Sequence, residues 1–297
     1  MAPTPASQTG QPIWPNDCTG AISLTMDNLG EAADLHRGVW PSEKPIGSHF
    51  TTTDTIPRML SLLRDCDIKA TYFIEAWNNA VYPSVIKSVR DEGHEIGFHA
   101  WQHEVWKVLD QETEVANLDR SIAAADKEIG VKYAGFRPPG GLVTERTLRL
   151  MKERGFTYLS PAAERPAIVD GVAMVPFRWR EIDAYYYMKA TAGLRTARGD
   201  TEDIMNADTV RDRLCRRIDE VAAGGGYSAF LFHPFLQTSE SRMSTMEAVL
   251  DRMKEREGEG KGKIWVATCN EVADWILQHP ENFPDDPEWD VSEWKKT

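Results

Sequence analysis

The feature that most constrains the fold of this chain is a repeated alternation of short strand-like stretches and longer helix-like stretches. Short apolar runs predict strands at 21–26, 68–74, 95–98, 133–136, 156–159, 172–177, 228–232 and 264–268. Apolar residues at helical spacing predict helices at 56–64, 83–92, 112–129, 144–154, 208–223, 245–257 and 271–277, the last capped by Asn270. Repeated strand–helix units of this length indicate an α/β fold with a parallel sheet, either open or closed into a barrel.

The length of the chain fits one domain of this kind. A single α/β barrel commonly has about 250 residues or more, and this chain has 297. We find no internal repeat and no low-complexity linker. We therefore expect an N-terminal arm over 1–19, one folded domain over 20–278 and a proline-containing tail over 279–297.

The net charge limits the classes of partner. Lys and Arg number 34 against 46 Asp and Glu, which gives a formal net charge of −12 at pH 7. Nucleic acids and anionic membranes are bound by basic surfaces, so this balance argues against both. We expect a small-molecule or oligosaccharide partner, and the sequence predicts no particular oligomeric state.

Cysteine usage and the N-terminus bear on the compartment. Cys18, Cys66, Cys215 and Cys269 stand far apart and form no C-x-x-C pair, so we expect buried free thiols. The first fifteen residues lack the basic start and apolar segment of a secretory leader. These features favour a cytoplasmic location, with export after removal of a leader left open.

A pair of histidines gives the first chemical signal. His99 and His103 lie four residues apart, directly after the predicted strand at 95–98. On a helical turn, side chains at this spacing share one face and can reach one ion. Neutral imidazole binds zinc and similar metals at about 2.0–2.1 Å. The alternative is that the pair caps a helix or fills a polar pocket.

Polar residues also follow three other predicted strands. Asp27, Arg137 and His233 come directly after strand-like segments, as His99 does. In a parallel βα fold, the carboxyl ends of the strands emerge on one face, where catalytic groups collect. We therefore expect these four residues to share one site, although they are spread over more than two hundred positions.

Four motifs, taken in order, resemble those of a known family. They are Thr25-Met26-Asp27-Asn28, His99-x-x-x-His103, Phe136-Arg137-Pro138-Pro139-Gly140 and Leu231-Phe232-His233. Together they are similar to the motifs of the polysaccharide deacetylases (carbohydrate esterase family 4), over roughly residues 20–275. The resemblance implies a distorted, TIM-like (β/α) barrel with seven parallel strands. It also implies metal-dependent hydrolysis of an N-acetyl amide.

The resemblance implies a role for each matched residue. His99 and His103 would bind a divalent metal, most simply zinc, with cobalt, nickel or manganese as alternatives. Asp27 would be the general base, His233 the general acid, and Arg137 would orient Asp27. These roles suit amide hydrolysis, because water must be activated for attack and the departing nitrogen must be protonated.

One residue departs from the family pattern. Asn28 stands where the family has a second aspartate that serves as the third metal ligand, and an amide oxygen is a weaker ligand than a carboxylate. Three arrangements stay open. Asn28 binds the ion weakly, Asp27 binds it directly, or Glu31 in the following loop replaces the missing carboxylate. A metal-free amidase is a further possibility, because an allantoinase-like branch has the same fold with altered ligands.

Further residues are candidates for substrate contact. Trp101 lies between the two histidines, and aromatic faces of this kind stack on sugar rings or apolar acyl groups. Pro138 belongs to the motif that contains Arg137. Trp179 and Asp183 follow another strand-like segment and match the family's fourth motif by position. We predict that these four residues line the pocket.

Three hypotheses for function follow. The first is a metal-dependent deacetylase of an acetylated amino sugar or polysaccharide. The second is a cytosolic hydrolase of a small amide or ureide on the same fold. The third is a sugar-binding pseudoenzyme in which Asn28 marks lost metal binding, although the retained Asp27, His99, His103, Arg137 and His233 argue against it.

Overall fold

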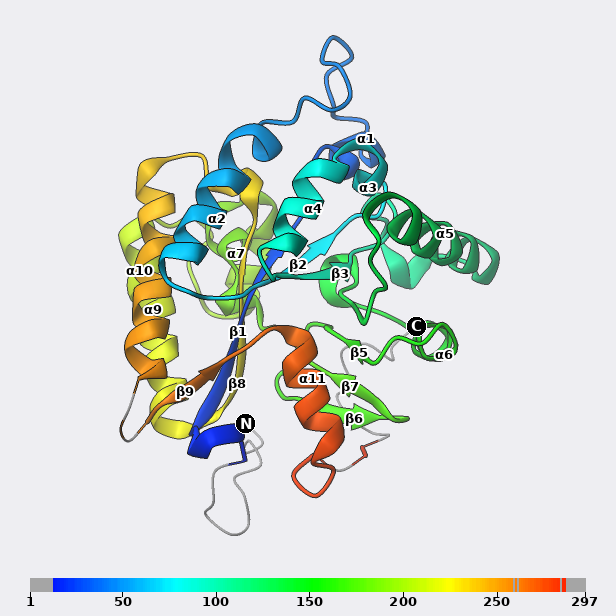
Figure 1. Ribbon diagram of the computed structural model, residues 1–297. Helices are drawn as coiled ribbons and strands as arrows, with labels where there is room; N and C mark the ends of the chain where they lie inside the picture. Colours follow the sequence, from blue (N-terminus) through cyan, green and yellow to red (C-terminus); the bar gives the residue numbers. More distant parts are fainter. Residues whose placement is uncertain (1–12, 259, 261, 284, 287–297) are drawn as a thin grey trace.

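A nine-stranded sheet forms the centre of the computed structural model, which describes residues 13–258, 260, 262–283 and 285–286 (Figure 1). The strands are β1 (Gly20–Asp27), β2 (Thr71–Ile74), β3 (Glu95–Phe98), β4 (Gly135–Phe136), β5 (Tyr158–Leu159), β6 (Ala167–Val169), β7 (Val172–Met174), β8 (Gly226–Phe232) and β9 (Ile264–Val266). Their order across the sheet is β6-β7-β5-β4-β3-β2-β1-β8, with β9 beside β1. All pairs are parallel except the β6–β7 hairpin. The carboxyl ends of the parallel strands therefore point the same way.

The predicted α/β barrel-like fold is confirmed, but the number of strands differs from the expected seven. The hairpin adds β6, because Asp170 and Gly171 both have positive φ (52° and 75°), as a tight two-residue turn requires. β9 adds another strand by pairing with Gly20–Ile22 of β1, whereas β2 pairs with Thr25–Asp27. Among the described strands, β6 and β8 end the path without pairing with each other, so the sheet forms a half-barrel.

Helices cover the outside of the sheet (Figure 1). They are α1 (Ala32–His36), α2 (Ile56–Asp65), α3 (Asn78–Val81), α4 (Pro83–Asp91), α5 (Gln111–Ala124), α6 (Glu145–Glu153), α7 (Asp183–Tyr187), α8 (Ala192–Ala197), α9 (Ala207–Gly224), α10 (Glu240–Glu257) and α11 (Cys269–Gln278). The long helices α9 and α10 pack against each other on one flank. In the described part of the chain, no helix has both the length and the apolar character needed to cross a membrane.

Polar side chains at the helix starts explain where several helices begin. Side chains of Asp110, Thr144, Asn206, Ser239 and Thr268 each accept a hydrogen bond from the backbone N–H three residues later. The prediction that Asn270 caps the last helix is wrong. Thr268 forms a reciprocal capping box with Glu271, which starts α11 at Cys269.

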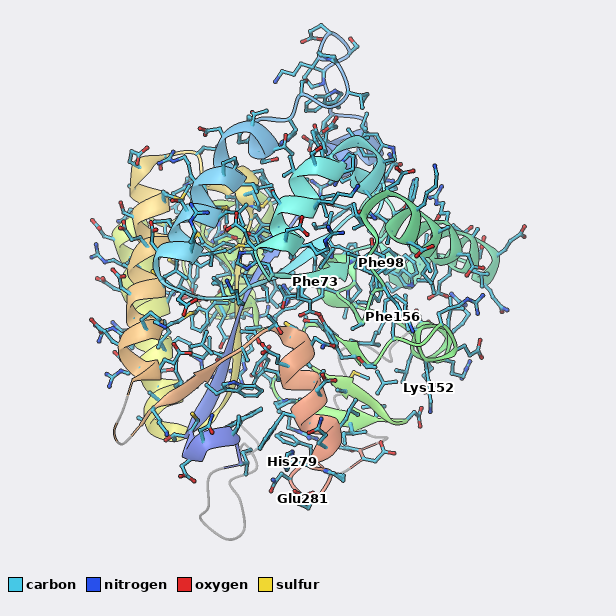
Figure 2. All side chains as sticks on the ribbon, viewed as in Figure 1. Phe73, Phe98, Lys152, Phe156, His279 and Glu281 are labelled. Carbon is cyan, nitrogen blue, oxygen red and sulfur yellow. The ribbon has the colours of Figure 1, made fainter. Side chains whose placement is uncertain are left out.

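Aromatic side chains fill the interior between the sheet and its helices. Phe73 and Phe98 are fully buried, and Figure 2 shows them with Phe156 inside the ring of helices. The Phe98 ring lies 4.9 Å from that of Phe136 and 5.6 Å from that of Trp106, centroid to centroid. This packing supports the strand ends that carry the candidate site.

The described parts of the expected arm and tail pack on the same core. The Trp14 ring lies 5.4 Å from that of Phe283 and 6.2 Å from that of Tyr227, and both Trp14 and Phe283 are buried. The rest of the arm, residues 1–12, and residues 284 and 287–297 of the tail lie outside the described residues. All four cysteines are free, as predicted from their spacing, but only Cys18 and Cys269 are buried, whereas Cys66 and Cys215 are partly exposed.

Candidate active site

The candidate residues gather at the carboxyl edge of the sheet. Asp27 ends β1, and His99, Arg137 and His233 directly follow β3, β4 and β8. All four are less than a tenth exposed. The topology alone explains this gathering, because β1 lies between β2 and β8 while β3 and β4 continue the sheet beyond β2.

Asp27 is held between a cation and an imidazole. Its Oδ1 accepts a hydrogen bond from Arg137 Nη1 at 3.0 Å, and its Oδ2 lies 3.8 Å from His99 Nε2. Arg137 also donates to Thr25 Oγ1 at 2.7 Å and to Ser160 Oγ at 3.0 Å. These bonds fix the guanidinium and therefore the orientation of the Asp27 carboxylate.

The two histidines are neutral near pH 7. Burial, with the nearby charges of Arg137 and Arg37, lowers the pKa of His99 to about 3. Burial and the charge of Arg37 lower the pKa of His103 well below its usual range. His99 Nδ1 lies 2.8 Å from the Arg137 carbonyl oxygen, which can only accept. The proton of His99 is therefore on Nδ1, and its Nε2 lone pair faces Asp27.

His103 has a different partner. Its Nδ1 lies 3.3 Å from Arg37 Nη2, and a guanidinium can only donate. The Nδ1 lone pair is therefore used, and neutral His103 carries its proton on Nε2. In this arrangement His103 would bind an ion only after the exposed Arg37 side chain had moved away. The sequence contained no signal for Arg37.

The structure distinguishes between the candidates for a third ligand. The buried Glu31 carboxylate accepts hydrogen bonds from the Tyr82 hydroxyl and from Gly47 N, so in this conformation it is not aimed at His99, and its use as a ligand stays a prediction. Asn28 Nδ2 donates to Glu75 Oε1, which leaves Oδ1 as the end of the amide that accepts no hydrogen bond from the described residues. Asp27 Oδ2 also remains open to an ion.

The donor chemistry fits a divalent metal in part. Within the described residues, no three His, Cys, Asp or Glu side chains are arranged together as a metal site. Nevertheless, His99 Nε2 and Asp27 Oδ2 lie 3.8 Å apart, and both are donor types that would hold a divalent ion. The backbone carbonyl that fixes the His99 tautomer is a common feature behind metal-binding histidines. His103 and the amide oxygen of Asn28 would complete the set.

His233 forms a separate pair with Asp183. His233 Nδ1 lies 2.6 Å from Asp183 Oδ1, and the His233 backbone N–H donates to Asp183 Oδ2 at 2.8 Å. Burial opposes the charged imidazole, but the Asp183 carboxylate outweighs burial and raises the pKa of His233. Asp183 is fully buried and also accepts from Gln237 Nε2 at 2.7 Å. Asp183 therefore supports His233 in this structure, and its predicted contact with substrate stays a prediction.

The other predicted pocket residues line loops beside these groups. Trp101 is partly buried under Arg120, whose guanidinium carbon lies 4.3 Å from the ring centroid. Trp179 is partly buried, with its ring 5.6 Å from that of Phe177, and Pro138 is buried. Substrate contact by Trp101, Pro138 and Trp179 stays a prediction.

One important residue was missed although a signal existed. Glu75 is fully buried and directly follows β2, so it obeys the same strand-end rule as Asp27. Burial raises its pKa to about 7, although hydrogen bonds from its own turn and from Asn28 and Leu29 oppose the rise. Glu75 lies outside the four motifs, and its place directly after β2 is the signal that identifies it.

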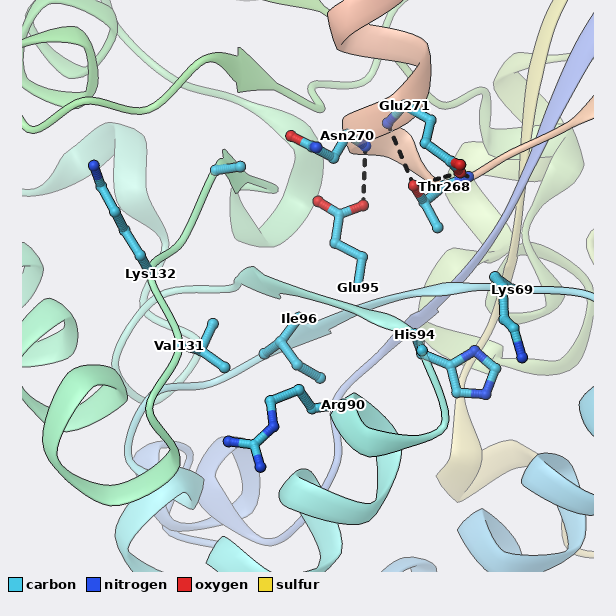
Figure 3. A pocket seen from close by; sticks show the side chains of 12 residues that line it. Lys69, Arg90, His94, Glu95, Ile96, Val131, Lys132, Thr268, Asn270 and Glu271 are labelled. Carbon is cyan, nitrogen blue, oxygen red and sulfur yellow. Dashed lines mark hydrogen bonds between the residues drawn. The ribbon is translucent and has the colours of Figure 1, made fainter.

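A cavity also opens at the opposite end of β3. It has a volume of about 330 Å³ and is lined by residues that include His94, Glu95, Lys132 and Asn270 (Figure 3). The Glu95 carboxylate there accepts from Asn270 N at 2.9 Å and from Tyr158 OH at 2.6 Å. Its lining includes His94 and Glu95 at the amino end of β3, whereas His99 lies at the carboxyl end, so the cavity is separate from the site around Asp27.

Comparison with known proteins shows similarity to one family. The family model described as polysaccharide deacetylase matches residues 41–159. Chitin deacetylase 1 of Saccharomyces cerevisiae is 34% identical over 172 residues, which cover 49% of this chain and 56% of that protein. This chain thus spans little more than half the length of that relative, and less of several others.

Solved structures share the fold over nearly the whole chain. A Mycobacterium smegmatis protein described as a polysaccharide deacetylase has a TM-score of 0.77 at 22% identity, covering 96% of both chains. The PuuE allantoinase has a TM-score of 0.72 at 20% identity, covering 94% of this chain and 99% of its own. At these identities the similarity establishes the fold alone.

Proposed function

This chain belongs to the polysaccharide deacetylase family, and on that premise we propose that it hydrolyses the C–N bond of an N-acyl group. The substrate class that we propose is an acetylated amino sugar or its polymer. The observation that supports this proposal most is that a candidate base and a candidate acid lie at the same edge of the sheet. Asp27 is a buried carboxylate held by Arg137, and His233 is an imidazole kept protonatable by Asp183.

The two groups suit opposite proton transfers. Asp27, fixed by Arg137, takes a proton from the attacking water. His233 has a raised pKa and gives a proton to the departing nitrogen. The charge of Asp27 is one of the causes that raise the pKa of His233, so the two groups are electrostatically coupled. An amide needs both transfers, because its nitrogen leaves poorly unless it is protonated.

We further propose that a divalent metal, most simply zinc, binds at His99, His103 and the oxygen atoms of Asp27 or Asn28. A bound divalent ion would lower the pKa of water and polarise the acyl carbonyl. The fixed tautomer of His99 supports this proposal. The contact between Arg37 and His103 means that Arg37 must move when the ion binds.

Acetate release from N-acetylglucosamine oligomers, measured with and without added zinc, tests the proposal. We expect zinc-dependent release, and we expect Asp27→Asn to lower kcat by about 100-fold or more while lowering zinc content less. Asp126→Asn, an exposed acid outside the site, is the matched control and should behave as the wild type. Oligomer binding without any acetate release would favour a sugar-binding protein instead.

A second candidate function is hydrolysis of a small amide or ureide. The specific observation is Arg37, an exposed guanidinium beside His103 whose N–H groups suit a carboxylate or ureide oxygen on the substrate. Turnover of a ureide without added metal, with no acetate from oligomers, would favour this function. Arg37→Ala should then raise KM for an anionic substrate, whereas deacetylation of a neutral oligomer should not depend on this charge.

A further inference from the structure

The residue after Asp27 is tied to a buried carboxylate. Asn28 Nδ2 donates to Glu75 Oε1, and Glu75 Oε2 accepts from Leu29 N at 3.3 Å and from Asn78 Nδ2 at 3.0 Å. Glu75 is fully buried and Asn28 is only 6% exposed. One carboxylate therefore holds both the side chain and the backbone of the turn that follows β1.

The backbone of this turn is also constrained. Asn28 has a φ of 62°, a left-handed conformation that asparagine tolerates better than most residues. Gly30 packs so closely on the next layer that a Cβ there would lie 2.6 Å from the Tyr82 ring and 2.8 Å from Asn78 Oδ1. The backbone of the turn therefore cannot shift easily. Within this fixed backbone, the contact with Glu75 orients the Asn28 side chain.

Glu75 is surrounded by hydrogen-bond donors, and the side chain at position 28 is one of them. All three partners of Glu75 offer N–H groups, and an ionised carboxylate can only accept. An aspartate at position 28 would place a second acceptor-only group against Glu75 where little water can reach either. Such a buried pair is strongly unfavourable unless a proton is shared.

We propose that Glu75 is a positioning residue that holds the Asn28 amide and makes an amide, rather than a carboxylate, the side chain that fits at position 28. By accepting from Nδ2, Glu75 leaves Oδ1 as the end of Asn28 available to the reaction centre beside Asp27. The asparagine at position 28, which departs from the family pattern, thus matches the presence of a glutamate at position 75. The use of Oδ1 at the metal rests on the proposed function, whereas the pairing itself does not.

A double-mutant cycle tests the pairing in the full-length protein. Asn28→Asp, Glu75→Gln and the double variant are compared with the wild type for thermal unfolding midpoint and for Zn²⁺ affinity by calorimetry. Asn28→Asp alone should lower the midpoint because two carboxylates meet. The double variant should recover it, because the amide introduced at position 75 can donate to the carboxylate introduced at position 28, which reverses the polarity of the same hydrogen bond. Its Zn²⁺ affinity should exceed that of Asn28→Asp by about fivefold or more.

Asn79→Asp is the matched control for the cycle. Asn79 is fully buried on the same helix as Asn78, but its Nδ2 donates to Tyr133 OH at 2.9 Å rather than to Glu75. Combination of Asn79→Asp with Glu75→Gln should give additive changes in midpoint. Additive changes for Asn28→Asp with Glu75→Gln as well would overturn the proposal.

The outcomes also separate this inference from the metal proposal. If none of the four proteins binds Zn²⁺, the metal proposal fails, and the unfolding midpoints alone decide the pairing. If Zn²⁺ binds equally to Asn28→Asp and to the double variant while the midpoints are non-additive, the pairing holds as a structural contact. In that case its proposed role in positioning Oδ1 is overturned. If the double variant recovers both the unfolding midpoint and the Zn²⁺ affinity relative to Asn28→Asp, the whole inference is supported.

Discussion

Asp183 holds His233 by two hydrogen bonds, one to the imidazole Nδ1 at 2.6 Å and one to the backbone N–H at 2.8 Å. The first contact places the His233 proton on Nδ1 when the ring is neutral, so Nε2 is the atom that exchanges a proton with a substrate. The second contact fixes the end of β8 relative to α7. A single buried carboxylate thereby sets the tautomer, the orientation and the charge preference of the proposed acid.

Replacement of Asp183 should move the pH dependence of activity. The Asp183 carboxylate raises the pKa of His233 against the effect of burial, so it keeps the imidazole protonated to higher pH. In Asp183→Asn the carboxylate charge is lost, and burial then lowers the pKa of His233. The alkaline limb of kcat/KM should therefore shift to lower pH. Asp126→Asn serves as the control, and an unmoved alkaline limb in Asp183→Asn would exclude His233 as the acid.

The same pair predicts a pH dependence of stability. A group whose folded pKa is raised stabilises the fold fully below its unfolded pKa, about 6.5 for histidine, and loses this contribution as pH rises through the folded value. The wild type should therefore lose unfolding free energy above about pH 6.5 relative to His233→Gln. Urea titrations of both proteins from pH 5 to pH 9 measure this difference, and parallel curves would contradict it.

His99 and His94 allow a matched test of metal binding. They flank the same strand, but His99 Nε2 faces Asp27, whereas His94 Nδ1 accepts from Ala70 N at 3.1 Å at the opposite end. We expect His99→Ala to abolish zinc uptake and His94→Ala to retain it. Elemental analysis of the purified proteins gives the answer. Zinc at the wild-type level in His99→Ala would show that the ion is bound elsewhere.

The sequence predicted the general architecture because period and spacing are local signals. Strand β3 was predicted at its observed bounds, and α4 and α6 within one residue at each end, because each has a clear apolar face and a glycine, proline or cap nearby. The β6–β7 hairpin was missed, although Asp170-Gly171 is a strong turn signal. The segment before it, with three apolar residues, is too short to show a period.

The candidate site was only partly predictable for a different reason. A motif identifies residues such as Asp27 and His99, but it does not give the hydrogen-bond partners that decide what each can do. Glu31 looked suitable for a metal because it is near Asp27 in sequence. In the fold its carboxylate turns to Tyr82 and Gly47. The Arg37 contact with His103 arises from a loop whose path no local pattern specifies.

Removal of Arg37 should make metal binding easier. The guanidinium uses the Nδ1 lone pair of His103 and adds positive charge beside both histidines. Arg37→Ala should therefore raise Zn²⁺ affinity by about threefold to thirtyfold, as expected for loss of one like charge near the ion. Arg64→Ala, an exposed arginine that pairs with Glu92, is the control. Calorimetric affinities that are equal in Arg37→Ala and the wild type would mean that Arg37 does not compete for His103.

Arg137 should contribute strongly to stability. It is 1% exposed and pairs with Asp27 at 3.0 Å, and its guanidinium carbon lies 4.2 Å from the Phe73 ring centroid. Removal of one partner of a buried ion pair leaves the other charge uncompensated, so Arg137→Met should lower the free energy of unfolding by about 3–5 kcal/mol. Arg154→Met breaks a more exposed pair with Asp119 and should lower it by about 1 kcal/mol or less. Urea denaturation compares the two. Equal losses would mean that the Asp27 carboxylate finds another partner when Arg137 is absent.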